Sequence, residues 1–388
     1  MASMGVLMQD VAVGWQLYER THSALALGLT GLASVAPTII FALPAGAVAD
    51  RYNRRNVARI GRIGAGAMSV WLAVLSATTG PVWMIYAALF LSGVGFAFIA
   101  PAQSALLTQV LPTEAYPNGV TWNSTGFQIA AVTGPAVGGA LIGLTGTATA
   151  VYVTCAIMAV IYICLFTAMR PRPQTHDRAP ITRQMLAAGI RFVFQDELIL
   201  AAITLDLFAV LLGGATTLLP IYAKDILHVG PSGLGWLRAA PSVGAMLTAL
   251  WLAHRGRLGR AGILLLCAVA GFGVATIIFG LSRSFPLSMA ALFLLGAFDS
   301  VSVVIRSSLV QLRTPDAMRG RVNAVNGIFI DLSNELGGFE SGTVAALIGP
   351  VATVVLGGIG TMLVVLVVGT RWHALREMRE LTGPPENA

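Results

Sequence analysis

Residues 46–55 read GAVADRYNRR and lie between two long apolar runs. The four charges in this short segment are costly inside a membrane, whereas the runs on either side are long enough to cross one. The segment is therefore predicted to be a tight, charged hairpin between two membrane-spanning helices.

The composition of the chain agrees with that prediction. Hydrophobic residues make up 56% and charged residues 11% of the 388 residues, and the mean hydropathy is +0.78. A soluble globular domain has roughly 25% charged residues. The alternating pattern typical of an outer-membrane barrel strand is absent. We therefore predict an all-α membrane protein with 12 transmembrane helices. The expected spans lie near 1–18, 24–48, 56–77, 82–106, 119–144, 148–169, 197–220, 234–253, 261–282, 287–311, 322–348 and 351–370.

The net charge of +7 is explained by the placement of the basic residues. Most of the Lys and Arg residues fall in loops on one predicted side, while Arg20, Lys224 and Arg283 fall on the other and Arg238 and Arg306 lie within spans. Positively charged loops stay in the cytoplasm, so these loops and the C-terminus are predicted to be cytoplasmic. The excess of basic residues thus indicates the membrane topology and does not indicate a nucleic-acid partner.

The chain repeats itself. Residues 87–93 read AALFLSG and residues 290–296 read AALFLLG, and the same register pairs Asn123 with Asn326 and Gly139 with Gly342. This predicts two parallel six-helix halves, as in many secondary transporters. The predicted divisions are a first half at 1–169, a cytoplasmic linker at 170–196, a second half at 197–370 and a cytoplasmic tail at 371–388. The first span is short, so we expect helix 1 to be truncated as the chain is written.

The pattern Gly-x-x-x-Asp-Arg-x-x-Arg-Arg at 46–55 resembles the signature loop between helices 2 and 3 of the major facilitator superfamily. The matching residues are Gly46, Asp50, Arg51, Arg54 and Arg55. The resemblance implies that Asp50 braces the start of helix 11, near Arg319, where helix amides attract a carboxylate. The alternative is a solvated loop whose charges only set topology. In the second half the corresponding segment reads AHRGRLGR at 253–260 and has no acidic residue.

Further segments resemble the branch of this superfamily that includes bacterial enterobactin (siderophore) exporters: QDVAVGWQLY at 9–18, LPIYAKD at 219–225 and MRGRV at 318–322. That branch implies a proton-driven exporter of a small amphipathic molecule in the bacterial inner membrane. Its partners would be the substrate, protons and the lipid bilayer, and we expect a monomer. The two halves would rock about a central cavity.

The segment GPAVGG at 134–139 resembles the Gly-Pro motif of helix 5 in that superfamily, usually associated with exporters. The motif residues are Gly134, Pro135, Gly138 and Gly139. Glycines four apart allow helices to approach closely, so the alternative is a packing role with no information on direction.

Charged residues within the spans are the candidate proton or substrate site, because each is costly in lipid unless it faces a cavity or a partner. They are Asp10, Asp206, Arg238, Asp299, Asp331, Glu335 and Glu340. Asp331 and Glu335 are one turn apart on one helix face, and two carboxylates this close favour the uptake of a proton. We expect them to take part in proton coupling. Arg306 is predicted to form a structural ion pair, and interhelical pairing is the alternative for the others.

The sequence indicates no catalytic residues, no metal site and no cofactor. The five histidines lie in loops or at span ends without metal-ligand spacing, and the three cysteines lie in apolar runs. We therefore expect no enzymatic activity. Two alternatives to export remain: an uptake symporter of the same fold, and a membrane-embedded enzyme or non-transporting sensor.

Overall fold

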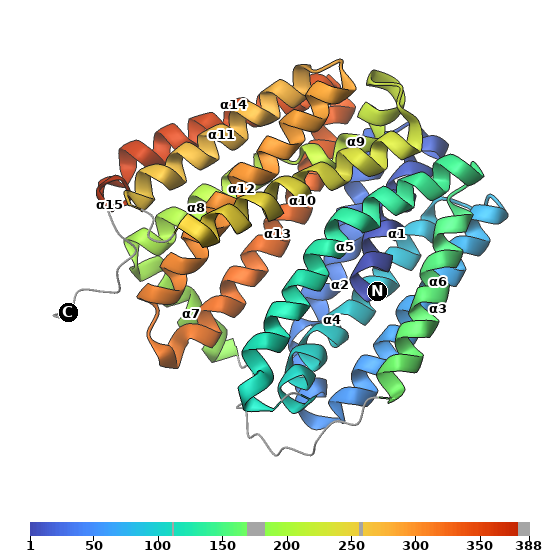
Figure 1. Cartoon of the computed structure of the whole chain (residues 1–388), viewed down its shortest axis with the longest axis horizontal. Coiled ribbons are helices and arrows are strands. Elements are labelled where there is room, and N and C mark those ends of the chain that lie inside the picture. Colours follow the sequence, from blue (N-terminus) through green and yellow to red (C-terminus); the bar gives the residue numbers. More distant parts are fainter. Residues whose placement is uncertain (111, 169–182, 256–258, 379–388) are drawn as a thin grey trace. The chain divides into compact units, whose positions relative to one another are not determined.

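The computed structural model describes residues 1–110, 112–168, 183–255 and 259–378, and the regular structure in those residues is helical (Figure 1). Residue contacts divide the chain into two units. Unit 1 comprises Met1–Ile181 and His228–Ala239, and unit 2 comprises Thr182–Leu227 and Ala240–Ala388. Helix α10 (Gly230–Arg255) contributes its first part to unit 1 and the rest to unit 2.

Unit 1 is built from six long helices and a short 3₁₀ turn. They are α1 (Ala2–Thr21), α2 (Ala24–Arg51), α3 (Arg54–Ala77), α4 (Trp83–Val110), η1 (Thr113–Ala115), α5 (Tyr116–Thr145) and α6 (Thr149–Ala168). Helix α1 packs on α5 and α6, α2 packs on α4, and α3 packs on both α4 and α6.

Unit 2 holds the remaining elements. They are α7 (Arg183–Gln195), α8 (Glu197–Leu212), η2 (Ala215–Leu218), α9 (Leu219–Ile221), η3 (Tyr222–Ile226), α11 (Ala261–Leu281), α12 (Phe285–Arg313), α13 (Asp316–Ile348), α14 (Pro350–Arg371) and α15 (His373–Glu377). Helix α8 packs on α13 and α14, and α11 packs on both α12 and α14. Under the sequence repeat, α8 corresponds to α1 and α11–α14 correspond to α3–α6. The main helix pairs of unit 1 therefore recur in unit 2.

Polar side chains and glycine end the helices where the chain turns. The hairpin predicted at 46–55 is tighter than expected, because α2 continues to Arg51 and α3 begins at Arg54. Asn53 caps α3, its side-chain oxygen accepting a hydrogen bond of 3.0 Å from the Arg55 N–H, which satisfies one of the free amides at a helix start. Gly146 ends α5 with a φ of 70°, a conformation that glycine adopts without steric cost.

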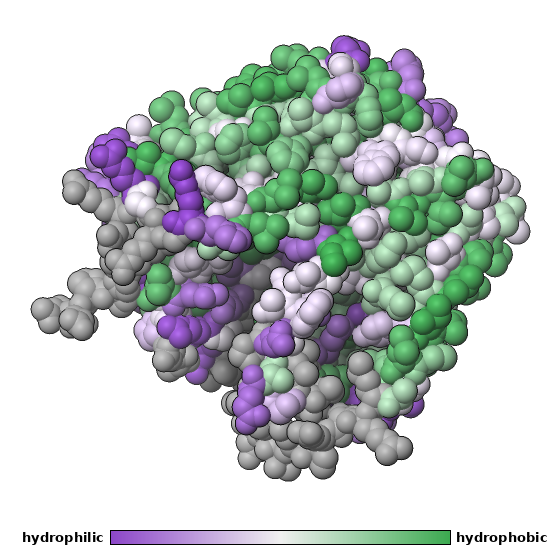
Figure 2. All heavy atoms as spheres, in the orientation of Figure 1, coloured by the Kyte–Doolittle hydropathy of each residue, from purple (hydrophilic) through white to green (hydrophobic). Residues whose placement is uncertain are grey.

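The surface of the helices is that of a membrane protein. On the face drawn in Figure 2, hydrophobic residues cover much of the length of the helices and hydrophilic residues gather near their ends. Large apolar side chains are widely exposed, such as Val160 at 60% and Leu366 at 62%. Contiguous exposed apolar surface of this kind marks an interaction with a membrane or a partner.

Within the described part of the chain, nine helical segments are long and apolar enough to cross a membrane. The other three long helices are α1, α10 and α13. Each of these carries charged residues named above as candidates, which lower its mean hydropathy. The nine apolar segments and these three polar helices together make up the 12 predicted spans.

The span predicted at 197–220 differs from expectation, because it is interrupted. Helix α8 ends at Leu212, and the chain continues through Gly213 and Gly214 into η2, α9 and η3. A Cβ placed on Gly214 would lie 2.6 Å from the Gly337 carbonyl oxygen of α13. The backbones of α13 and this segment therefore approach too closely for any larger residue at that position.

Candidate functional site

Among the residues that the structure describes in unit 2, two buried side chains of opposite charge form an ion pair between α8 and α12. Asp206 is 7% exposed and Arg306 is 4% exposed, and the Arg306 guanidinium contacts the Asp206 carboxylate directly. Packing places these side chains together, because α8 lies against α12 at this level. The pair is neutral overall, which lowers the cost of holding two charges in an apolar interior.

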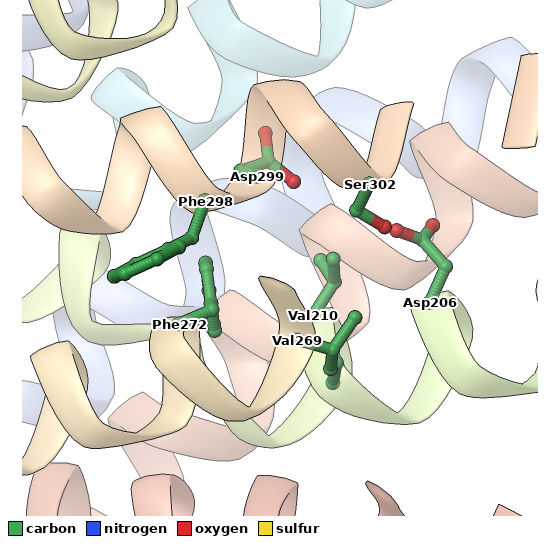
Figure 3. A pocket seen from close by; sticks show the side chains of 8 residues that line it. Asp206, Val210, Val269, Phe272, Phe298, Asp299 and Ser302 are labelled. Atoms are coloured by element: carbon green, nitrogen blue, oxygen red, sulfur yellow. The ribbon is translucent and has the colours of Figure 1, made fainter. Parts of the chain in front are cut away.

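A small cavity of about 10 Å³ lies beside the ion pair, room for about one water-sized group (Figure 3). Its lining comes from three helices of unit 2. The lining residues are Asp206, Ala209, Val210, Val269, Phe272, Phe298, Asp299 and Ser302. Figure 3 shows the Ser302 hydroxyl and the Asp206 carboxylate pointing toward one another. Asp299 and Ser302 are three residues apart on α12, and thus on the face that also presents Arg306.

A second pair of opposite charges lies in unit 1. Asp10 of α1 is partly buried, and Arg238 of α10 lies within electrostatic range of it. The same helix α1 carries two further polar contacts. Ser69 of α3 donates a hydrogen bond of 2.8 Å to Gln9, and Tyr152 of α6 donates one of 2.7 Å to Gln16. Helix α1 is therefore a polar helix inside its unit.

The Gly-Pro motif of α5 makes close contacts on two sides. Gly134 and Gly138 lie against α1, where a Cβ on Gly138 would come within 3.2 Å of the Met8 backbone. Gly139 lies against α10, where a Cβ would come within 2.5 Å of the Pro231 carbonyl oxygen and 2.7 Å of the Gly235 Cα. Both glycine faces of the motif are thus used for helix packing.

The three candidate carboxylates of α13, Asp331, Glu335 and Glu340, do not line the cavity in unit 2. Asp331 is exposed, and Glu335 is partly buried and has an interaction of its own. Glu340 accepts a hydrogen bond of 3.3 Å from the Ser341 hydroxyl. A role for Asp331 and Glu335 in proton coupling stays a prediction.

The signature loop is described only in part, because the side chains of Asp50 and Arg51 and the environment of Gly46 lie outside what the structure describes. Arg54 has a partner. Arg55 donates a hydrogen bond to the Thr167 carbonyl oxygen near the end of α6. This basic residue therefore ties the start of α3 to α6, and the bracing role of Asp50 stays a prediction.

Several polar residues at these contacts are not predicted from the sequence, because neutral side chains within apolar runs attract no notice. Ser302, Gln16 and Tyr152 belong to this group. The sequence assigns Arg20 only to topology, yet Arg20 donates hydrogen bonds of 2.8 Å to the Gly80 carbonyl oxygen and 3.0 Å to the Leu75 carbonyl oxygen. A cation is favourable at the C-terminal end of a helix, here that of α3. The position of Arg20 at the end of the first span is the feature of the sequence that could have indicated this contact.

Comparison with known proteins gives consistent relatives. Residues 1–387 match the family model described as "Transmembrane secretion effector". The chain is 28% identical to the multidrug efflux pump Tap of Mycolicibacterium fortuitum, covering 96% of this chain and 92% of that protein. It is 26% identical to the enterobactin exporter EntS of Citrobacter koseri, covering 100% of this chain and 92% of that protein.

Solved structures with the same fold include a peptide transporter of the POT family, with a TM-score of 0.76 at 12% identity, covering 98% of this chain and 93% of that one. A bacterial homologue of the human lysosomal transporter Spinster has a TM-score of 0.72 at 14% identity, covering 97% of this chain and 94% of that one. A D-xylose–proton symporter has a TM-score of 0.68 at 15% identity, with 95% coverage of both chains.

Proposed function

Since the chain belongs to the transmembrane secretion effector family of major facilitator transporters, we propose that it exports a small amphipathic molecule from the bacterial cytoplasm across the inner membrane. Export would proceed by alternating access and be driven by the inward flow of protons. We further propose that it acts as a monomer with its C-terminus in the cytoplasm.

The observation that carries this proposal is the presence of opposite charges within the spans of each unit. Unit 1 holds Asp10 with Arg238, and unit 2 holds Asp206 with Arg306. Charged side chains within membrane-spanning helices are energetically costly and by default mark substrate or ion pathways. A transporter needs such groups in order to bind polar cargo and coupling ions inside the bilayer, whereas a structural membrane protein can do without them.

The relatives favour export as the direction of transport. The two named above are an efflux pump and an exporter, with different cargo, and each aligns over nearly the whole chain. The fold alone does not settle direction, since a proton symporter shares it. An uptake symporter is therefore the second candidate.

Transport into everted inner-membrane vesicles separates the two candidates. In such vesicles the cytoplasmic face points outward, so an exporter accumulates the probe inside. We expect ethidium or enterobactin to accumulate when respiration acidifies the lumen, and the accumulation to collapse with a protonophore. Accumulation in right-side-out vesicles, and none in everted ones, would establish the uptake symporter instead.

A variant ties the transport to this protein. We expect Asp10→Asn to abolish gradient-driven accumulation, because it removes the carboxylate of α1 that lies within electrostatic range of Arg238. The matched control is Glu114→Gln, which neutralises an exposed acidic residue in η1. The control should transport like the unmodified protein, and equal activity of Asp10→Asn would remove Asp10 from the pathway.

A further inference from the structure

We propose that Asp299 is the carboxylate that binds and releases the coupling proton, and that the small cavity in unit 2 is its binding site. This inference rests on the proposed function and supplies what that proposal leaves open, the place where the proton is held.

The charges around the cavity do not balance when every group is ionised. Two carboxylates line it, Asp206 and Asp299, and one cation, Arg306, is in direct contact with Asp206. The positive charge of Arg306 is therefore already matched by Asp206. Among the described residues, Asp299 has no hydrogen-bond or ion-pair partner. An ionised Asp299 would thus be an uncompensated charge within a membrane-spanning helix.

The surroundings make that charge costly. Around Asp299 the cavity is lined by apolar side chains, including Val210, Val269, Phe272 and Phe298. A lone carboxylate in such a place is unfavourable, and taking up a proton removes the cost. Release of the proton restores the charge and requires water or a cation to reach the group. Asp299 thus has two states whose relative stability depends on access to water, which is what alternating access changes.

The nature of the ligand follows from the number of oxygen atoms. A hard metal cation such as Ca²⁺ takes six to eight oxygen ligands. The lining side chains supply one free carboxylate, one hydroxyl and a second carboxylate already paired with Arg306. A cavity of about 10 Å³ has room for about one water molecule. A proton fits this site, and a hydrated metal cation does not.

We assign the binding of the coupling proton to no other titratable group near the cavity. Helix α11 contributes Val269 and Phe272, which are apolar. Helix α8 contributes Asp206, which is neutralised by Arg306. The described carboxylates of α13, Asp331, Glu335 and Glu340, are absent from the lining. Uptake of a proton at Asp299 therefore converts one carboxylate into a neutral acid, and no other bond changes.

Infrared spectroscopy of the purified protein in lipid tests the site without any substrate. A protonated carboxylic acid has a carbonyl stretching band that a carboxylate lacks. We expect the unmodified protein to show such a band at neutral pH and to lose it as the pH is raised. The Asp299→Asn variant should lack the band at neutral pH, where ordinary carboxyl groups are ionised. Glu114→Gln and Asp331→Asn should retain it.

The outcomes decide the proposal. A band that persists in Asp299→Asn, or that vanishes in Asp331→Asn instead, overturns it. Absence of any band in the unmodified protein also overturns it. Should Asp299→Asn not fold, Asp299→Glu keeps an acid at this position in a different environment, and an unshifted band in that variant would refute the assignment.

Transport supplies a second and separate readout. In everted vesicles we expect Asp299→Asn to lose ethidium accumulation driven by the pH gradient, while exchange of ethidium across the membrane without a gradient is retained. Unimpaired gradient-driven accumulation would overturn the assignment. If the unmodified protein moves neither ethidium nor enterobactin, the proposed function fails for these probes, and the infrared result still stands or falls on its own.

Discussion

The buried ion pair of unit 2 should respond differently to the loss of one partner and to the loss of both. Asp206→Asn leaves the Arg306 guanidinium charged in an apolar interior, and breaking a buried pair in this way costs about 3–5 kcal/mol. We expect the purified variant to unfold at a clearly lower temperature, or at a lower mole fraction of a denaturing detergent, than the unmodified protein.

The double variant Asp206→Asn with Arg306→Gln is the control for that prediction. It removes both charges and keeps groups of similar size, so its stability should recover most of the loss. A double variant as unstable as Asp206→Asn would show that the ion pair is not the cause, and that shape at these positions dominates.

Asp331 should behave as a substrate-facing group. It is exposed on α13, and an exposed carboxylate within a span faces water more readily than lipid. With Asp299 as the proton carrier proposed above, we expect Asp331→Asn to raise the KM for the cationic probe ethidium and to leave gradient-driven transport in place. Loss of proton coupling with unchanged KM would return the coupling role to the pair Asp331 and Glu335, as the sequence alone predicts.

Single residues show what a sequence can and cannot reveal about the site. The candidates Asp206, Asp299 and Arg306 follow from the cost of charge in a membrane. The partner of Arg306 could not be predicted, because Asp206 is 100 residues away and the contact depends on how α8 and α12 pack. Ser302 carries no charge, and only its position between Asp299 and Arg306 on one helix face identifies it as part of the site.

At the scale of elements, the contact between α5 and α10 should be intolerant of any side chain at Gly139. A Cβ there would lie 2.5 Å from the Pro231 carbonyl oxygen, and overpacking of this kind costs about 1–3 kcal/mol. Gly126 lies on the same helix, and a Cβ placed on it would have nothing within 4 Å. We expect Gly139→Ala to loosen the contact, whereas Gly126→Ala should be neutral or slightly stabilising.

Disulfide crosslinking measures that contact directly. Gly143 of α5 faces Ser232 of α10, so Gly143→Cys with Ser232→Cys should crosslink readily once the exposed Cys164 and Cys267 are replaced by serine. The yield should fall when Gly139→Ala is added and stay unchanged with Gly126→Ala. Equal yields in all three proteins would show that the glycine contact is not limiting.

The elements themselves are largely predictable, because apolar length determines where a chain can span a membrane. Their ends are less so. Helix α13 begins at Asp316, before the expected start at 322, since polar residues continue a helix beyond the apolar run. The break after α8 is not predicted, because Gly213 and Gly214 do not interrupt the hydropathy. Only the packing against Gly337 shows that the backbone must approach α13 there.

At the scale of the whole molecule, the two units share a packing pattern but not their loops. The same helix pairs form in both units. In unit 1 they involve α1, α3, α4, α5 and α6, and in unit 2 they involve, in the same order, α8, α11, α12, α13 and α14. The acidic residue of the signature loop is present only in the first half, at Asp50, because residues 253–260 have none. We therefore expect any conformational role of this acidic residue to be carried out by the first half alone.

We predict that Asp50 stabilises the state that is closed toward the cytoplasm, by interacting with the start of α13. A carboxylate at a helix N-terminus contributes on the order of 0.3–2 kcal/mol, which changes a two-state ratio by roughly twofold to thirtyfold. Asp50→Asn should therefore shift the population toward the cytoplasm-open state and lower the rate of turnover.

Spin labels at Tyr52→Cys and Gly320→Cys, both exposed positions, would report a longer distance in Asp50→Asn than in the protein with Asp50. Glu114→Gln, which changes an acidic loop residue on the same predicted side, should leave the distance unchanged. If Asp50→Asn leaves it unchanged as well, the loop has only a topological role, and the preference for one state must arise within the helices.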